Sequence, residues 1–180
     1  TDDGHLQAFS INEPELWSYY PIDNNAKGID NLKKYIDTAL SARKNKTHYP
    51  FIVFDRLKNE YAGSTRYYDI QLLHKTLYIG STWYGKRFQG TGLNKHCKFL
   101  LLQFAFENMQ MERAGFEADN TNEKSIAAMK SIGCVVEGVL RSNKAMENRR
   151  RDTIVLSILK DEWFGGVKEN LVAAIKKLEV

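Results

Sequence analysis

The chain has 180 residues, of which 43% are hydrophobic and 27% are charged, and its formal net charge is +4. This length suffices for one domain with a core of its own, and the composition excludes a disordered chain. No apolar run approaches the roughly 20 residues of a membrane-spanning helix, and the polar first ten residues lack the apolar region of a signal peptide. The modest positive charge suits acidic or phosphate-bearing ligands, but it does not by itself indicate a nucleic-acid-binding protein.

Two cysteines, Cys97 and Cys134, both fall in apolar segments. Cysteine behaves as a small hydrophobic residue in such settings, and disulfides are rare in reducing compartments. We therefore interpret both as reduced core residues of a cytoplasmic protein.

The first half of the chain is predicted to hold two helices and three antiparallel strands. The run 12–15 resembles a helix start, because Pro14 would lie in the first turn. A second helix is predicted over 28–44, where apolar residues recur on one face. The strands, which are rich in β-branched and aromatic residues and are separated by turn residues, are predicted over 49–56, 61–70 and 74–83.

The second half alternates helices and strands. The helices, which show apolar residues at helical spacing, are predicted over 93–108, 121–132 and 161–180. The strands are predicted over 113–118, 135–140 and 153–159. Gly133 suits the C-cap of the second of these helices, and Gly165 and Gly166 should break the third. No internal repeat or linker is present, so residues 1–180 are predicted to form one domain with a mixed α/β sheet, mostly antiparallel and flanked by helices.

The most informative segment is Arg87-Phe88-Gln89-Gly90-Thr91-Gly92, which lies between a predicted strand and a predicted helix. Its glycines allow the backbone to approach a ligand closely, and the first N–H groups of the following helix are unpaired and point outward. A helix start with a basic, glycine-containing loop is a typical anion-binding site. The sequence therefore predicts that a phosphorylated ligand binds here.

Several other phosphate-binding and catalytic motifs are excluded. A Walker A loop needs Lys and Ser or Thr after its last glycine, whereas Leu93 and Asn94 follow Gly92. A dinucleotide-binding loop needs a third glycine at the position of Lys95. The chain also lacks the zinc-site and serine-hydrolase motifs, and no metal site is predicted.

The remaining pattern, Arg/Gln-x-x-Gly-x-Gly at the start of a helix, resembles the acyl-CoA loop of the GNAT acetyltransferase superfamily. The segments 122–133, 137–141 and 151–163 resemble three further motifs of its RimJ/RimL-type branch, which acetylates the N-termini of ribosomal proteins. The resemblance covers about residues 14–163. Members of the family usually begin with a strand before the first helix, and we expect that strand to be missing here.

The resemblance implies an acyl-CoA site between two strands that splay apart, one ending near Trp83 and the other near Asp119. The pantetheine arm would pair with backbone 81–83, and N–H groups of 89–93 would hold the pyrophosphate, with help from Lys86 and Arg87. Asn122 would contact the cofactor arm, unless it only caps its helix. The residues thus assigned to the cofactor acetyl-CoA are Ser81, Thr82, Trp83, Arg87, Gln89, Gly90, Thr91, Gly92, Leu93, Asn122 and Ser125.

The implied reaction is direct acetyl transfer from acetyl-CoA to an amine. A backbone N–H near Thr82 could stabilise the thioester oxygen, and Ser125 could protonate the leaving sulfur. Asp119 is the preferred catalytic base, with Glu117 as a neighbour, and its alternative role is to cap the next helix. His96 occupies a position where relatives commonly carry Glu. A water-mediated proton path without a dedicated base is a further possibility.

The identity of the acceptor stays open between a protein N-terminal amine and a small amine. Five aromatic residues could line its site or could serve in packing: Trp17, Tyr19, Tyr20, Tyr67 and Tyr68. The cluster Arg149 to Arg151 is either a solvated turn or a contact for an acidic substrate, RNA or the ribosome. The alternative function is a non-catalytic acyl-CoA-binding or regulatory module. A monomer and a homodimer both fit the sequence, and no membrane partner is predicted.

Overall fold

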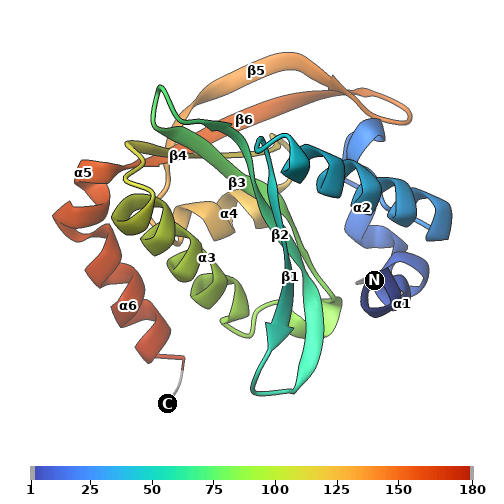
Figure 1. Ribbon diagram of the computed structural model, residues 1–180, viewed down its shortest axis with the longest axis horizontal. Coiled ribbons are helices and arrows are strands. Elements are labelled where there is room, and N and C mark those ends of the chain that lie inside the picture. Colours follow the sequence, from blue (N-terminus) through green and yellow to red (C-terminus); the bar gives the residue numbers. More distant parts are fainter. Residues whose placement is uncertain (1–2, 179–180) are drawn as a thin grey trace.

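A computed structural model describes residues 3–178, which form one six-stranded sheet with helices on both faces (Figure 1). The strand order is β1-β2-β3-β4-β6-β5, and all neighbours are antiparallel except β3 and β4. The strands are β1 (Tyr49–Asp55), β2 (Glu60–Gln71), β3 (Thr76–Tyr84), β4 (Arg113–Asp119), β5 (Val135–Ala145) and β6 (Arg150–Leu159). The helices are α1 (Asp3–Asn12), α2 (Ile29–Lys44), α3 (Leu93–Gln103), α4 (Glu123–Lys130), α5 (Lys160–Glu162) and α6 (Lys168–Lys176). The predicted mixed α/β fold is confirmed.

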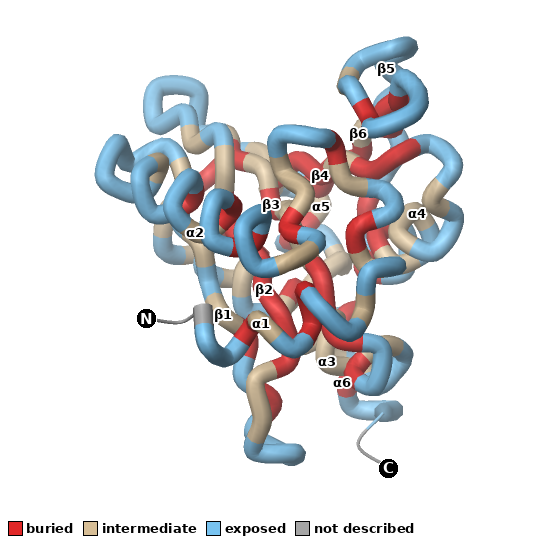
Figure 2. The backbone as a smooth tube through the Cα atoms, turned by 90° about the vertical axis from the view of Figure 1, so that its right-hand side faces the viewer, coloured by how far each residue is buried: buried red, intermediate tan, exposed pale blue. Residues whose placement is uncertain are grey.

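Each face of the sheet carries its own hydrophobic core. Helices α3, α4 and α6 cover one side, which we call the α3 face, and α1 and α2 cover the other, the α2 face (Figure 1). The core of the α3 face includes Leu77, Phe106 and Leu156, all of which are fully buried. That of the α2 face centres on Trp17 and Trp83. Figure 2 shows the buried segments running along the central strands, with mostly exposed residues on the outer side of α2.

The start of the chain differs from the prediction. The run 12–15 is the end of α1 and the beginning of a short 3-10 helical turn, Pro14–Trp17, and not the start of a longer helix. Proline lacks an N–H group and disfavours helical geometry in the residue before it. Glu13 accordingly leaves the helix with φ −126° and ψ 61°. Helix α1 was missed because its polar sequence turns little more than Leu6 and Phe9 toward the core.

The remaining helices agree with the predictions, with two irregularities. Beyond α3 the predicted helix continues as a π-helical turn, Phe104–Asn108. The predicted break in the last helix occurs at Gly166, whose φ is 137°, between α5 and α6. The predicted end of that helix at residues 179 and 180 lies outside the described residues.

The hairpin of β5 and β6 is longer than predicted. Its strands were expected to end at 140 and to resume at 153, but pairing continues to Ala145 and Arg150. The additional residues are polar, so they do not show the apolar alternation of a half-buried strand. The polar segment is therefore a two-stranded extension of the sheet, and Arg150 and Arg151 are strand residues.

The two central parallel strands separate along their length. Strand β3 pairs with β4 over only three residues of each strand, Thr76 to Tyr78 against Arg113 to Gly115. Beyond that point β3 stays paired with β2, and β4 stays paired with β6 as far as Asp119. The predicted splay is thus confirmed, and a gap opens between the carboxyl ends of β3 and β4. In the described part of the chain, no helix is long and apolar enough to cross a membrane.

Candidate active site at the gap between β3 and β4

The glycine loop lies where β3 ends and α3 begins. A 3-10 turn, Lys86–Phe88, follows the strand, and Gly90 and Gly92 then adopt left-handed φ values of 78° and 87°. Residues with a side chain rarely adopt such values, so the two glycines permit this path. The Gln89 side-chain amide donates to the Tyr84 carbonyl at 2.8 Å, and the Thr91 hydroxyl donates to the Phe88 carbonyl at 2.8 Å. These bonds hold the loop while the first N–H groups of α3 remain at an unpaired helix end.

The start of α4 lies across the gap from this loop. Asn122 caps α4, since its side-chain oxygen accepts the backbone N–H of Ser125 at 3.0 Å. Lys124 donates a hydrogen bond to the side-chain oxygen of Gln89, so it links α4 to the glycine loop. Two helix starts and a lysine therefore meet at the gap, which makes it favourable for a negatively charged ligand. The sequence reasoning missed Lys124, although its place in the first turn of α4, next to Asn122, was a signal.

At the start of the loop, the charged group of Arg87 and the backbone of Lys86 are engaged by residues outside the gap. Arg87 forms an ion pair with Glu60 at 2.5 Å and lies over the Phe88 ring. The backbone N–H of Lys86 donates to Glu13 at 2.6 Å. Arg87 also lines a pocket of about 470 Å³ between α1 and the β1–β2 turn. In this arrangement the Arg87 guanidinium points toward α1 and β2, where Glu60 neutralises its charge.

The backbone at residues 81–83 forms a bulge at the edge of the gap. Ser81 has φ 45°, and the pairing register between β2 and β3 shifts beside it, opposite residues 64–66. The Tyr20 hydroxyl donates to the Thr82 carbonyl at 3.0 Å, and the Tyr35 hydroxyl donates to the Ser81 carbonyl at 3.4 Å. Trp83, the next residue, is buried in the core of the α2 face. The bulge is therefore held from the α2 face by two tyrosines.

A family model described as "Acetyltransferase (GNAT) domain" matches residues 1–135, which is most of the chain. The chain belongs to the GNAT acetyltransferase family. The family that the resemblance indicated is thereby confirmed.

Individual relatives agree with this assignment. The curated protein "Putative ribosomal N-acetyltransferase YdaF" of Bacillus subtilis (strain 168) is 34% identical over 83 residues, or 46% of this chain and 45% of that protein. The chain thus spans less than half the length of this relative. The crystal structure of a "putative acetyltransferase" from T. thermophilus is 33% identical with a TM-score of 0.82, over 96% of this chain and 89% of that one. Mycobacterium smegmatis RimJ in complex with CoA-disulfide has a TM-score of 0.83 at 18% identity, over 96% of this chain and 84% of that one, and shares the fold. The predicted GNAT family is confirmed, and the likeness to YdaF agrees with the predicted RimJ/RimL-type branch.

In this GNAT-family chain, Asp119 ends β4 at the gap, and both of its carboxylate oxygens have partners. Its buried carboxylate accepts the N–H and the hydroxyl of Thr121 at 2.9 and 2.7 Å and pairs with Arg149 at 2.5 Å. Burial alone would raise the pKa of Asp119, but the bonds from Thr121 and Arg149 outweigh it, and the pKa lies below its ordinary value. A carboxylate of lowered pKa is a weak base, and these contacts are those of a turn-capping residue.

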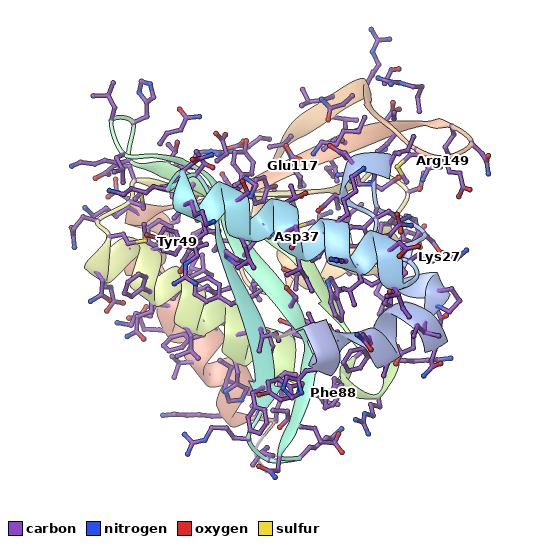
Figure 3. All side chains as sticks on the ribbon, turned by 45° about the vertical axis from the view of Figure 1, so that its right-hand side comes forward. Lys27, Asp37, Tyr49, Phe88, Glu117 and Arg149 are labelled. Atoms are coloured by element: carbon purple, nitrogen blue, oxygen red, sulfur yellow. The ribbon has the colours of Figure 1, made fainter. Side chains whose placement is uncertain are left out.

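The polar side chains of the α2 face gather beside the bulge. Arg66, which lies on β2 and pairs with Gly80 of β3, places its guanidinium carbon 4.4 Å from the centre of the Tyr35 ring. Tyr20 lines a pocket of about 240 Å³, whose other lining residues include Lys27 and Arg149. Figure 3 shows Lys27 and Arg149 on the same side of the molecule. Through Tyr20, whose hydroxyl bonds to the Thr82 carbonyl, this pocket adjoins the bulge on the α2 face.

The five aromatic residues considered for an acceptor site separate in the structure. Trp17 belongs to the core of the α2 face, and Tyr67 faces α3, where its hydroxyl donates to the Leu101 carbonyl at 2.6 Å. Tyr19 is exposed. Tyr20 and Tyr68 lie on the α2 face, where both are in electrostatic range of Arg151. Burial on that face raises the pKa of both phenols.

The three arginines of the cluster 149–151 differ in their contacts and in their burial. Arg149 pairs with Asp119, and Arg150 is exposed and bonds to the Ser142 hydroxyl at 3.1 Å. Arg151 is buried, with 6% of its surface exposed. The interpretation as a solvated turn is therefore wrong for Arg151, because pairing through 150 and 151 carries it onto the covered face of β6.

Proposed function

We propose that this GNAT acetyltransferase transfers an acetyl group from acetyl-CoA directly to a primary amine of a protein N-terminus or a small molecule. The observation that carries the proposal is the gap between β3 and β4, which lies between the glycine loop and the start of α4. A gap between parallel strands, bordered by two helix starts, fits an extended ligand that carries phosphates at one end.

The chain offers matching groups along this gap. Backbone N–H groups of 89–93 would hold the pyrophosphate, and Lys124 would add a charge-assisted contact. Backbone 81–83 would pair with the pantetheine arm, next to Asn122 and Ser125. When bound, acetyl-CoA supplies an acetyl group activated as a thioester. Gly90 and Gly92 support this fit, because neither carries a side chain of its own that would keep a ligand from its backbone.

The pKa that the acceptor amine must have favours a protein N-terminus as the acceptor. The attacking amine must be neutral, and an α-amino group has a pKa of about 7.7–8, whereas that of a lysine side chain is about 10.4. A useful fraction of α-amine is therefore neutral near pH 7 without a strong base. This suits a site in which Asp119 is a weak base, so we propose that the proton leaves through water and that Ser125 protonates the leaving sulfur. The name of YdaF, a putative ribosomal N-acetyltransferase, supports a protein as the acceptor.

Two measurements test the proposal. Thermal unfolding of the full chain should shift upward by several degrees in millimolar acetyl-CoA, since a ligand that binds only the folded state stabilises it. Release of CoA thiol should then depend on an added amine, in a panel of peptides with free N-termini, lysine derivatives and polyamines. A chain that binds acetyl-CoA but acetylates no amine in the panel would contradict the proposed function. Absence of a thermal shift would contradict the assigned binding site.

A further inference from the structure

Two buried arginines on the α2 face carry charge without an ion pair. Arg66 is 3% exposed and Arg151 is 6% exposed. Within residues 3–178, neither has a carboxylate partner at ion-pair distance. A buried charge without a partner is costly, and proteins tolerate it mainly where a ligand or a function compensates.

Arg66 leaves open the edge of its guanidinium that fits a carboxylate. The Tyr35 ring covers one flat side of the group, but the buried Nε and Nη2 atoms have no hydrogen-bond partner. The same two atoms of Arg113 hold the two carboxylate oxygens of Glu137, at 3.2 and 2.6 Å. Such a bidentate contact is among the stronger and more specific hydrogen-bond arrangements of arginine. Arg66 thus presents a carboxylate-binding edge that no residue of the described chain occupies.

The acidic residues nearby are already neutralised. Glu117 pairs with Lys144 at 2.7 Å, and Asp119 pairs with Arg149. Both acids are in electrostatic range of Arg151, but the pKa of Arg151 is still lowered, chiefly because of burial. The charges of Arg66 and Arg151 are therefore a surplus on this face. A surplus of buried positive charge favours anionic ligands and disfavours polyamines.

The open edge lies on the acceptor side of the bulge. Arg66 pairs with Gly80, the residue directly before Ser81, and the ring that it contacts, Tyr35, bonds to the Ser81 carbonyl. Tyr20 bonds to the Thr82 carbonyl, lines the pocket of about 240 Å³ and is in electrostatic range of both arginines. A ligand group at Arg66 would therefore lie close to the backbone at which the acetyl group would be delivered.

We propose that the acceptor carries a carboxylate near its amine, and that this carboxylate binds the Nε–Nη2 edge of Arg66 while Arg151 adds a second positive charge. The proposal rests on the proposed function and specifies its acceptor. Since the two nitrogen atoms are shielded from solvent, the carboxylate must displace a covering side chain. Tyr20 is half-buried, lines the pocket and is held there by its bond to Thr82, so it is the side chain that we expect to move.

The test compares acceptors that differ in one carboxylate, with thiol release from acetyl-CoA as the readout. One pair consists of tetrapeptide amides with glutamate or glutamine in the second position, and it tests a side-chain carboxylate. Alanine and alaninamide form the other pair, which tests the carboxylate of a free amino acid, and spermine serves as a cationic acceptor. We expect kcat/KM to favour the acidic member of at least one pair by about tenfold or more, as for a charged hydrogen-bond pair. Equal values within both pairs, or a preference for spermine, would overturn the inference.

Variants then assign the preference to Arg66. Arg66→Met should bring the acid-to-amide ratio close to one, and Arg66→Lys, which keeps the charge but loses the planar edge, should lower it. The exposed Arg150→Met is the matched control and should keep the wild-type ratio. If Arg66→Met does not fold, Arg66→Lys and the wild-type ratio decide the question. Turnover without any preference refutes this inference alone, whereas no turnover with any amine refutes the proposed function as well.

Discussion

Lys98 is the clearest case in which this fold carries an energetic cost. It lies on α3 with 5% of its surface exposed, and its ammonium donates to the Thr82 and Thr65 hydroxyls at 2.7 and 3.4 Å. The Phe116 ring centre is 5.9 Å away, and no carboxylate in the described chain pairs with Lys98. Burial lowers the pKa of Lys98 from its ordinary value of 10.5 to about 8.

The magnitude of the cost follows from this difference in pKa. A fall from 10.5 to about 8 corresponds to about 3 kcal/mol of unfavourable free energy for the charged group. Between these pH values the folded chain binds fewer protons than the unfolded chain, so its stability should rise with pH. The Thr65 and Thr82 hydroxyls, 2.8 Å apart, can still bond to each other when Lys98 is replaced. We therefore expect Lys98→Met to be more stable by about 1–3 kcal/mol near pH 7.

Urea unfolding of both proteins at several pH values measures this effect. The advantage of Lys98→Met should be full below about pH 8 and should shrink as the pH rises toward about 10.5. Lys34→Met, an exposed replacement on α2, is the control and should change stability little at any pH. If Lys98→Met is less stable than wild type near pH 7, or if its advantage does not depend on pH, the reasoning from an uncompensated buried charge is wrong.

Three further variants test the donor site. Gly92→Val places a branched side chain at φ 87° and against the C-terminal segment, and it should weaken acetyl-CoA binding about tenfold or more in a thermal-shift titration, whereas Gly138→Val, which faces open space, should not. Ser125→Ala should lower kcat about 10–100-fold at unchanged KM for acetyl-CoA, and an unchanged kcat would exclude it as proton donor. Asp119→Asn should destabilise the fold by about 1–2 kcal/mol near neutral pH. That loss should vanish in acid unfolding as the pH falls through the lowered pKa, below 3.8.

The donor side of the site could be predicted because its determinants are local. The strand, the turn with Gly90 and Gly92 and the following helix are neighbours in the chain, and each has a pattern of its own. The predicted turn between a strand and a helix is confirmed, and both glycines in it have left-handed φ values. The splay of β3 and β4 came with the family resemblance, and the pairing of only three residues per strand confirms it. Local signals failed where a polar segment formed regular structure, as in α1 and the outer part of the β5–β6 hairpin.

The acceptor side of the site could not be predicted, because it is formed by contacts between segments that lie far apart in the sequence. Alternation along β2 predicts that Arg66 and Tyr67 face opposite ways, but only the strand order and the packing of α2 and α3 decide which of them meets Tyr35. The sequence around Arg151 favoured a turn, whereas pairing with β5 makes it a buried strand residue. Helical spacing likewise placed Lys98 on α3, but it did not reveal that the ammonium group is buried and bonded to the Thr82 hydroxyl. A sequence pattern describes how residues face within their own element, whereas burial and charge compensation depend on what the other elements bring to the same place.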